Sequence, residues 1–321
     1  MALSTQLHVV TGKGGTGKTT VAAALAMSLA DEGKKVLLCE VEGRQGIAQL
    51  FDVAPLPYEE RKIAVGLGGG AVYALAIDPE SALLEYLAMY YRLGRAGKAL
   101  DRFGIIDFAT TIAPGVRDVL LTGKVYEAAR RREGRDFTYD AVVMDAPPTG
   151  RITRFLNVNS EVAGLAKVGP IRRQADAIME MMRSTDTHVH LVTVLEEMPV
   201  QETIDGIADL KGADLPVAHV ILNLVRPPLI SAATRHALTS RDMTVEAVGD
   251  SLESVGLDPK AAYDLMSGGV ANMKRQDLQD SQRDILLDCG QPLVELPSLP
   301  DGIDLGALFE LAETLKSEGV A

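Results

Sequence analysis

The stretch TGKGGTGKTT, residues 11–20, contains only glycine, lysine and threonine and separates two runs of very different character. The apolar run LHVVT (7–11) precedes it and has the composition of a buried strand. The run KTTVAAALAMSLA (18–30) follows it and is rich in residues that favour helices. A strand, a glycine-rich loop and a helix N-terminus in this order form a cradle for phosphate groups.

Two motifs fit this loop. Its glycines match GxGxxG, the loop of dinucleotide-binding folds, while residues 12–19 match GxxxxGK[ST], the phosphate loop of nucleoside triphosphatases. A dinucleotide loop presents bare backbone to a pyrophosphate and does not require lysines. Because Lys13 lies within the loop and Lys18 follows it, the sequence favours a nucleoside triphosphate bound with magnesium.

Each residue of such a loop has an expected part in binding. The backbone N–H groups of residues 14–19 surround the phosphates, Lys18 reaches the β and γ phosphates, and the Thr19 hydroxyl binds Mg²⁺. Thr20 is placed for the α phosphate. The predicted nucleotide-binding residues of the loop are therefore Gly12, Lys13, Gly14, Gly15, Thr16, Gly17, Lys18, Thr19 and Thr20.

A phosphate loop also predicts an acidic residue at the end of a later strand, near the magnesium. The run YDAVVMD (139–145) ends in Asp145, and APPTG then breaks the strand. An aspartate before prolines is also a common turn residue, but the independent phosphate loop favours a metal ligand. Gly150 is expected to approach the γ phosphate through its backbone, so Asp145, Pro148, Thr149 and Gly150 form a predicted second switch segment.

Apolar runs typical of strands alternate with helical patterns along the whole chain. Near-continuous valine, isoleucine and leucine runs separated by helices predict a doubly wound, mostly parallel α/β sheet of about seven to eight strands. We expect one domain over residues 1–321, with a helical elaboration at about 230–290. Besides the first strand, the expected strands are 36–40, 72–77, 139–145, 188–195, 217–223 and 292–297.

Composition narrows the possible partners. The net charge of −12 argues against a nucleic-acid surface, and no apolar run approaches the roughly 18 residues of a membrane-spanning helix. The two cysteines, Cys39 and Cys289, are too few for a structural zinc site within one chain. The N-terminus shows no secretory signal, so we expect a cytoplasmic protein that needs no zinc, binds no nucleic acid and does not insert directly into a membrane.

Several segments resemble one family of ATPases. The loop GKGGTGKTT (12–20), with Lys13 as a second lysine, resembles the deviant Walker A loop shared by ParA, MinD and the anion-transporting ATPases. DAPPTGRITRFL (145–156) is similar to the switch II segment of the last group, the ArsA-type arsenite-pump and Get-type targeting ATPases. APGVRDVL (113–120), AIDPESALLEY (76–86) and VLEEMPVQET (194–203) resemble further segments of that group.

The resemblance implies a dimer that closes around two ATP molecules. Lys13 would reach across the interface to the partner's phosphates, as an arginine finger does elsewhere. By position, Asn223 would contact the adenine and the loop around Pro297 would cover it. ATP hydrolysis to ADP would open the dimer and change the surface offered to an unidentified client protein or a partner in a membrane system.

The chain departs from this family in the first switch segment. Glu42, in EVEGRQG (40–46), occupies the place of an aspartate that positions the attacking water near Mg²⁺. Since a misplacement of about 1 Å can cost around a hundredfold in rate, Glu42 is expected to catalyse slowly or with help from a partner. Glu40 loses the ribose role of the dinucleotide alternative, and either a magnesium or a structural role remains open for it.

Two further departures concern the client. The CxxC that joins the dimers of targeting ATPases is absent, as are arsenite-binding cysteines. Only 31 residues (157–187) separate the second switch segment from the next strand, which leaves little room for a long client-binding insertion. The sequence therefore predicts a Mg²⁺-dependent ATPase, homodimeric or paired with a paralogous ATPase. The catalytic residues would be Lys13, Glu42 and Asp145, and the magnesium ligands Thr19, Glu42 and Asp145.

Two alternatives remain open. One is a subunit that binds nucleotide but hydrolyses it weakly, within a hetero-oligomer with a paralogue. The other is a positioning ATPase of the ParA or MinD type, although the acidic chain lacks a basic amphipathic C-terminal helix.

Overall fold

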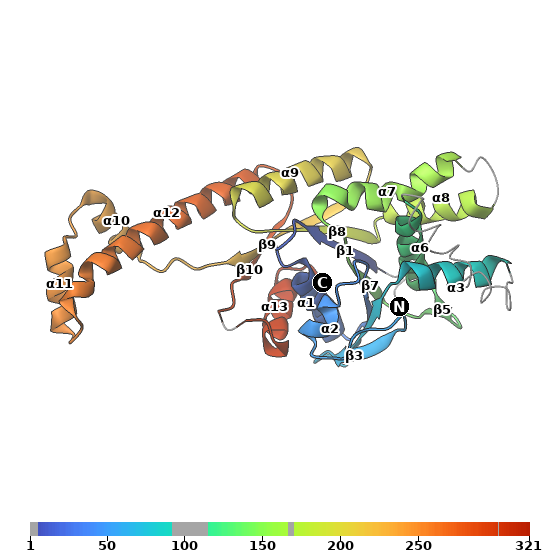
Figure 1. Cartoon of the computed structure of the whole chain (residues 1–321), viewed down its shortest axis with the longest axis horizontal. Helices are drawn as coiled ribbons and strands as arrows, with labels where there is room; N and C mark the ends of the chain where they lie inside the picture. Colours follow the sequence, from blue (N-terminus) through green and yellow to red (C-terminus); the bar gives the residue numbers. More distant parts are fainter. Residues whose placement is uncertain (1–5, 92–114, 166–169, 301) are drawn as a thin grey trace.

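A computed structural model describes residues 6–91, 115–165, 170–300 and 302–321 of the chain. Its centre is an eight-stranded sheet covered by helices on both faces (Figure 1), which confirms the predicted fold class. The main strands are β1 (Gln6–Gly12), β2 (Lys35–Glu40), β3 (Arg61–Val65), β4 (Ala71–Ala76), β7 (Ala141–Asp145), β8 (Thr187–Thr193), β9 (Val217–Val225) and β10 (Leu293–Pro297).

The helices of the described residues alternate with these strands. They are α1 (Lys18–Asp31), α2 (Gly46–Leu50), α3 (Pro79–Tyr91), α6 (Val116–Arg130), α7 (Thr149–Leu165), α8 (Pro170–Met182), α9 (Glu197–Gly212), α10 (Ala232–Ser240), α11 (Val245–Ser254), α12 (Ala262–Leu287) and α13 (Leu305–Ser317). A small hairpin of β5 (Arg132–Glu133) and β6 (Asp136–Phe137) lies apart from the main sheet. The segment 113–120, which resembles a family motif, begins outside the described residues.

The strand order β10-β9-β8-β1-β7-β2-β4-β3 places β1 near the centre of the sheet. All neighbouring pairs are parallel except β3 and β4, which are antiparallel. The next strand in the chain, β2, lies on one side of β1, and the later strand β8 lies on its other side. In doubly wound sheets such a reversal opens a crevice at the carboxyl ends of the strands, and ligands bind there.

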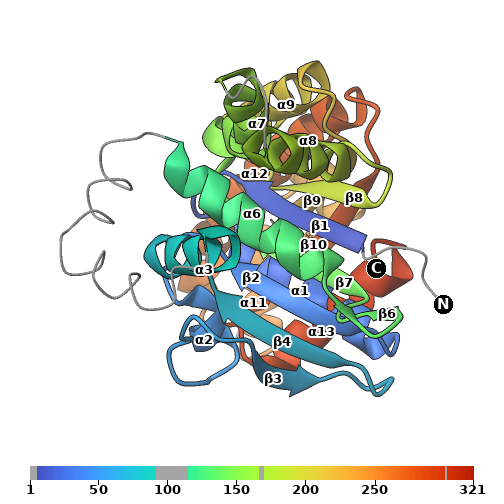
Figure 2. The ribbon, with the colours of Figure 1, turned by 90° about the vertical axis from the view of Figure 1, so that its right-hand side faces the viewer.

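Two hydrophobic cores lie on opposite faces of the sheet. Helices α6, α7, α8 and α9 cover one face, and α1 and α13 cover the other (Figure 2). Helix α1 is buried almost all round, because it packs on the sheet and α13 packs against it on the same face. Burial of this helix fixes the position of its N-terminus, where the glycine-rich loop ends.

Strand β3 was not predicted. Residues 61–76 form both β3 and β4, joined by the glycine-rich turn GLGGG (66–70), whereas the sequence suggested only one strand there, at 72–77. A Cβ atom on Gly66, Gly68 or Gly70 would lie 2.1–2.4 Å from backbone atoms at the end of α1 and beyond it. These glycines are therefore required by close packing against α1, and the hairpin forms the antiparallel edge of the sheet.

The stretch 230–290 consists mainly of α10, α11 and α12, and most of it does not cover the sheet. Figure 1 shows α10, α11 and α12 extending away from the sheet beside β9 and β10. Only the C-terminal part of α12, with Gln282 and Leu286 buried, joins the core, and α12 also packs against α9. No helix within the described ranges is long and apolar enough to cross a membrane.

Four histidines form a stacked row across the central strands. His8 on β1, His188 and His190 on β8, and His219 on β9 have neighbouring ring centroids 5.1–5.4 Å apart. Nδ1 of His8 and Nε2 of His190 are 3.1 Å apart, so one ring donates a hydrogen bond to the other. Burial, and then the neighbouring histidines, lower the pKa of His8 to about 3 and that of His190 well below its usual value.

This row predicts that the protein loses stability in mild acid. The unfolded chain protonates these histidines below about pH 6.5, whereas His8 and His190 stay neutral in the folded state, so acid favours unfolding from pH 6.5 downward. Each such histidine accounts for about 1.4 kcal/mol of unfolding free energy between pH 7.5 and 5.5. Urea unfolding at both pH values measures the loss. The loss should be about 1.4 kcal/mol smaller in His190→Leu, and an equal loss would contradict the assignment.

Candidate functional site

The glycine-rich loop lies between β1 and α1, at the carboxyl end of the central strand. It turns back on itself through the hydrogen bond from Thr16 Oγ1 to the Lys13 carbonyl (2.9 Å). A Cβ atom on Gly12 would lie 2.1 Å from the carbonyl oxygen of Val192 on β8, so only glycine fits there. Gly17 precedes α1 in the left-handed conformation (φ 87°), which glycine adopts without strain. The local chemistry of the loop therefore requires these glycines.

Thr19 and Asp145, whose roles as magnesium ligands remain predictions, lie in contact at this edge of the sheet. The Thr19 hydroxyl, in the first turn of α1, donates a 2.7 Å hydrogen bond to Oδ2 of Asp145 at the end of β7. Oδ1 of Asp145 is buried and has no hydrogen-bond partner among the described residues. Burial, reinforced by Glu40 and Glu42, raises the pKa of Asp145 to about 6, although Thr19 and Lys18 act in the opposite direction.

Lys18 lies close to the same carboxylates. Its side chain is only 8% exposed, and burial lowers its pKa, while Asp145 and Glu42 favour the charged form. Lys18, Thr19 and Asp145 thus bring a cation, a hydroxyl and a carboxylate together at a helix N-terminus. Such a set suits a phosphate group bound together with a hard divalent cation.

The first switch segment is shaped by Glu40 rather than by Glu42. The Glu40 carboxylate is buried and accepts hydrogen bonds from the backbone N–H groups of Gln45 (2.5 Å) and Ile47 (3.3 Å). These contacts favour the structural role that the sequence had left open for Glu40. Glu42 is partly exposed and forms an ion pair with Arg44 (3.6 Å).

Removal of the Glu40 carboxylate should loosen this segment. In Glu40→Ala, hydrogen exchange at the amides of Gln45 and Ile47 is expected to be roughly ten- to a hundredfold faster, since hydrogen bonds to charged groups are worth more than neutral ones. Mass spectrometry of the peptide that contains residues 41–47 measures the rates. Glu59→Ala removes an exposed carboxylate and serves as the control. Unchanged exchange in Glu40→Ala would show that the two contacts do not hold the segment.

The second switch segment is tied to the glycine-rich loop and to α9. The Thr11 hydroxyl, at the end of β1, donates a 2.7 Å hydrogen bond to the Pro147 carbonyl. Thr149 begins α7, and a Cβ on Gly206 of α9 would lie 2.9 Å from its methyl carbon. Gly150 lies in the first turn of α7, and its approach to the γ phosphate remains a prediction. Its position still leaves its backbone N–H without a partner inside the helix.

The structure places three other predicted residues outside this group. Lys13 does not face its own loop, because its Nζ forms an ion pair with Oε1 of Glu202 on α9 (2.8 Å). Asn223 is buried near the end of β9 and donates from Nδ2 to the Thr16 carbonyl (2.8 Å). Pro297 ends β10, where it pairs with Val225 of β9. Asn223 thus stabilises the loop, while its contact with adenine remains a prediction.

Sequence reasoning missed the partners that hold the site together. Thr11 and Glu202 were not selected, because their roles depend on contacts with residues far away in the chain. Arg44 was visible beside Glu42, but its pairing with that carboxylate follows from the tight turn of the segment. The short spacing between Glu42 and Arg44 in the sequence was the one local sign of this ion pair.

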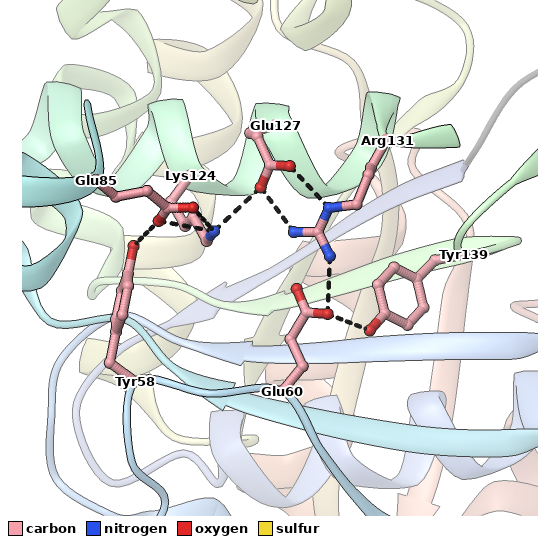
Figure 3. A network of polar contacts seen from close by, with 7 residues as sticks. All are labelled: Tyr58, Glu60, Glu85, Lys124, Glu127, Arg131 and Tyr139. Carbon is pink, nitrogen blue, oxygen red and sulfur yellow. Dashed lines mark hydrogen bonds and ion pairs between the residues drawn. The ribbon is translucent and has the colours of Figure 1, made fainter. Parts of the chain in front are cut away.

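A second polar cluster lies away from the loop and has a structural explanation. Figure 3 shows a chain of hydrogen bonds and ion pairs in which each carboxylate faces a lysine, an arginine or a tyrosine. It borders a surface pocket between α3, α6 and the segment before β3. Because its charges are paired within the cluster, it joins these elements. Its members are Tyr58, Glu60, Glu85, Lys124, Glu127, Arg131 and Tyr139.

The site also fits a magnesium ion bound with phosphate. Magnesium is commonly held by one or two protein oxygens together with phosphates and waters, and not by a full cage of side chains. Thr19 and the unpaired Oδ1 of Asp145 supply such oxygens. In the part of the chain that the structure describes, no three histidine, cysteine or carboxylate residues form a metal-binding group. Nucleotide phosphates would therefore have to complete the coordination.

A strand, a phosphate-binding loop and a helix, with an acid at the end of the neighbouring strand, define a P-loop nucleoside triphosphatase. Comparison with known proteins identifies the group. Residues 5–189 match the family model described as anion-transporting ATPase. The chain belongs to this family, and it is an ATPase.

Named relatives agree with this assignment. The chain is 49% identical to "ATPase BagA" of Mycobacterium tuberculosis over 318 residues, which are 98% of this chain and 94% of that protein. It is 29% identical to "Putative arsenical pump-driving ATPase 1" of Aquifex aeolicus over 213 residues, 65% of this chain and 51% of that protein. It is 26% identical to "ATPase GET3" of Kluyveromyces lactis over 249 residues, which are 67% of this chain and 70% of that protein.

Proposed function

We propose that the chain is a cytoplasmic, Mg²⁺-dependent ATPase that works as a dimeric switch on a client protein or a partner in a membrane system. The meeting of Thr19 with Asp145 beside Lys18 is the observation that carries the proposal. Lys18 and Thr19 come from the first turn of α1 and Asp145 from the end of β7, and their combination matches the needs of a magnesium–triphosphate complex.

Each residue then has a defined part. The N–H groups of the loop and of α1 bind the phosphates, and Lys18 neutralises the β and γ phosphates. Thr19 and Asp145 would hold a magnesium ion, which would supply positive charge to stabilise the phosphate oxygens. Glu42 orients the attacking water, and for this it must separate from Arg44. Loss of the γ phosphate removes contacts to the switch segments, which changes the surface that the dimer presents.

Lys13 is assigned to the partner's phosphates. Its ammonium faces Glu202 on α9, and its side chain is 31% exposed. A second chain that approaches this face would therefore meet a cation able to stabilise charge on its own nucleotide.

The ion pair between Glu42 and Arg44 favours a second candidate function for this chain. A longer acid that is engaged by an arginine would activate water poorly, which suits a nucleotide-binding subunit of a hetero-oligomer with a paralogous ATPase. Phosphate release by the purified chain, measured against protein concentration with Mg²⁺ or with EDTA, distinguishes the two. Turnover per chain that rises with concentration and requires Mg²⁺ supports the homodimer. Turnover that stays near background until a paralogue is added supports the subunit.

A further inference from the structure

One face of α9 contacts both mobile parts expected of the ATPase. Glu202 and Gly206 are four residues apart, so their side-chain positions lie on the same face of the helix. Glu202 forms the 2.8 Å ion pair with Lys13 of the phosphate loop. Gly206 lies so close to Thr149 of the second switch segment that a Cβ would come within 2.9 Å of the threonine methyl group.

The ion pair decides where the Lys13 ammonium can point. The side chains are 31% and 38% exposed, so solvent screens the pair and it can open. An ammonium held against Glu202 cannot lie against a phosphate of another chain at the same time. The contact therefore opposes the arrangement that the dimeric ATPase requires.

We propose that Glu202 is a positioning residue, which holds Lys13 within its own subunit until a second nucleotide-bound chain takes up the lysine. This inference rests on the proposed function, in which Lys13 acts on the partner's phosphates. When both chains carry nucleotide, Lys13 can leave the single carboxylate of Glu202 for several phosphate oxygens of the partner's nucleotide. Release of Lys13 is favourable only in that state. Glu202 thereby lowers the activity of isolated chains and links hydrolysis to assembly.

Chemical labelling of lysines tests the contact without using ATP. The nucleotide-free full-length chain is treated briefly with an amine-reactive ester, and modification of Lys13 is quantified by mass spectrometry. In Glu202→Gln the label should react with Lys13 about two- to fivefold faster than in the wild type, the range expected for a partly exposed ion pair. Glu202→Asp, which keeps the charge, should react more slowly than Glu202→Gln. Asp209→Asn removes an exposed carboxylate elsewhere on α9 and should match the wild type.

Steady-state turnover tests the consequence for assembly. The protein concentration that gives half-maximal turnover should fall about two- to fivefold in Glu202→Gln and stay unchanged in Asp209→Asn. Equal labelling of Lys13 in the wild type and Glu202→Gln would overturn the proposal, and so would an unchanged half-maximal concentration. If no variant hydrolysed ATP at any concentration, the proposed function would fail instead, and the labelling rates would still decide whether Glu202 holds Lys13.

Discussion

Lys18→Ala should lower the rate of ATP hydrolysis by about a hundredfold or more, because it removes the main cation facing the transferred phosphate. The side chain is buried beside Asp145 and Glu42, a position that a lysine would not take for solubility. Phosphate release from saturating Mg·ATP measures the loss. Mg·ATP should also fail to raise the melting temperature of the variant, because the phosphates lose their principal ligand.

A matched variant separates this effect from a change in net charge. Lys316→Ala removes an exposed lysine from α13, far from the loop in the sequence, and should hydrolyse ATP at the wild-type rate. Folding of Lys18→Ala is checked by circular dichroism before any rate is compared. Wild-type turnover by a folded Lys18→Ala protein would mean that the phosphate loop does not bind the substrate as proposed.

Asp145→Asn should give opposite changes in activity and stability. Turnover is expected to fall by about a hundredfold or more, because a neutral amide is a poor ligand for Mg²⁺ and cannot neutralise it. Stability of the nucleotide-free protein should rise, since the variant no longer buries a carboxylate with an unpaired Oδ1. The amide oxygen can still accept the hydrogen bond from Thr19. A gain of about 1–2 kcal/mol in unfolding free energy at pH 7.5 is expected.

The gain in unfolding free energy of Asp145→Asn should be largest at neutral pH and should decrease in acid. Burial raises the pKa of Asp145 to about 6, above its usual 3.8, so the ionised carboxylate costs stability at neutral pH. The difference between variant and wild type should shrink as the pH falls from about 6 toward 4, because the folded wild type then becomes protonated. Urea unfolding of both proteins across this range measures it. A variant that is less stable at pH 7.5 would contradict the burial argument.

Much of the fold followed from short-range patterns. The first helix was predicted at 18–30 and observed at Lys18–Asp31, because alanine-rich helical sequence between a loop and Gly33 leaves little choice. Helix α13 buries Leu308, Leu311, Ala312 and Leu315, whose spacing in the sequence is that of one apolar helix face. Strand β3 escaped prediction because it is an exposed edge strand whose pairing depends on the glycine turn packing against α1.

The candidate site, like the fold, could be predicted from the sequence only in part. The phosphate loop and Asp145 were predictable, since each combines a local motif with the end of a strand. The partners of Lys13, Asn223 and Glu40 were not, because sequence spacing says nothing about which distant surface a side chain will meet. Asn223 illustrates the difference, since it was selected by position for adenine and donates a hydrogen bond to the Thr16 carbonyl of the loop.

The most direct test of the dimeric switch is the mass of the chain in solution with and without nucleotide. Sedimentation velocity of the purified protein is measured alone, with Mg·ADP and with Mg²⁺ and a non-hydrolysable ATP analogue. The proposal predicts the mass of two chains with the analogue and a return toward one chain with ADP, and Lys13→Ala should weaken the analogue-bound dimer. A mass that is the same under all three conditions, whether of one chain or of two, would contradict an ATP-driven dimer.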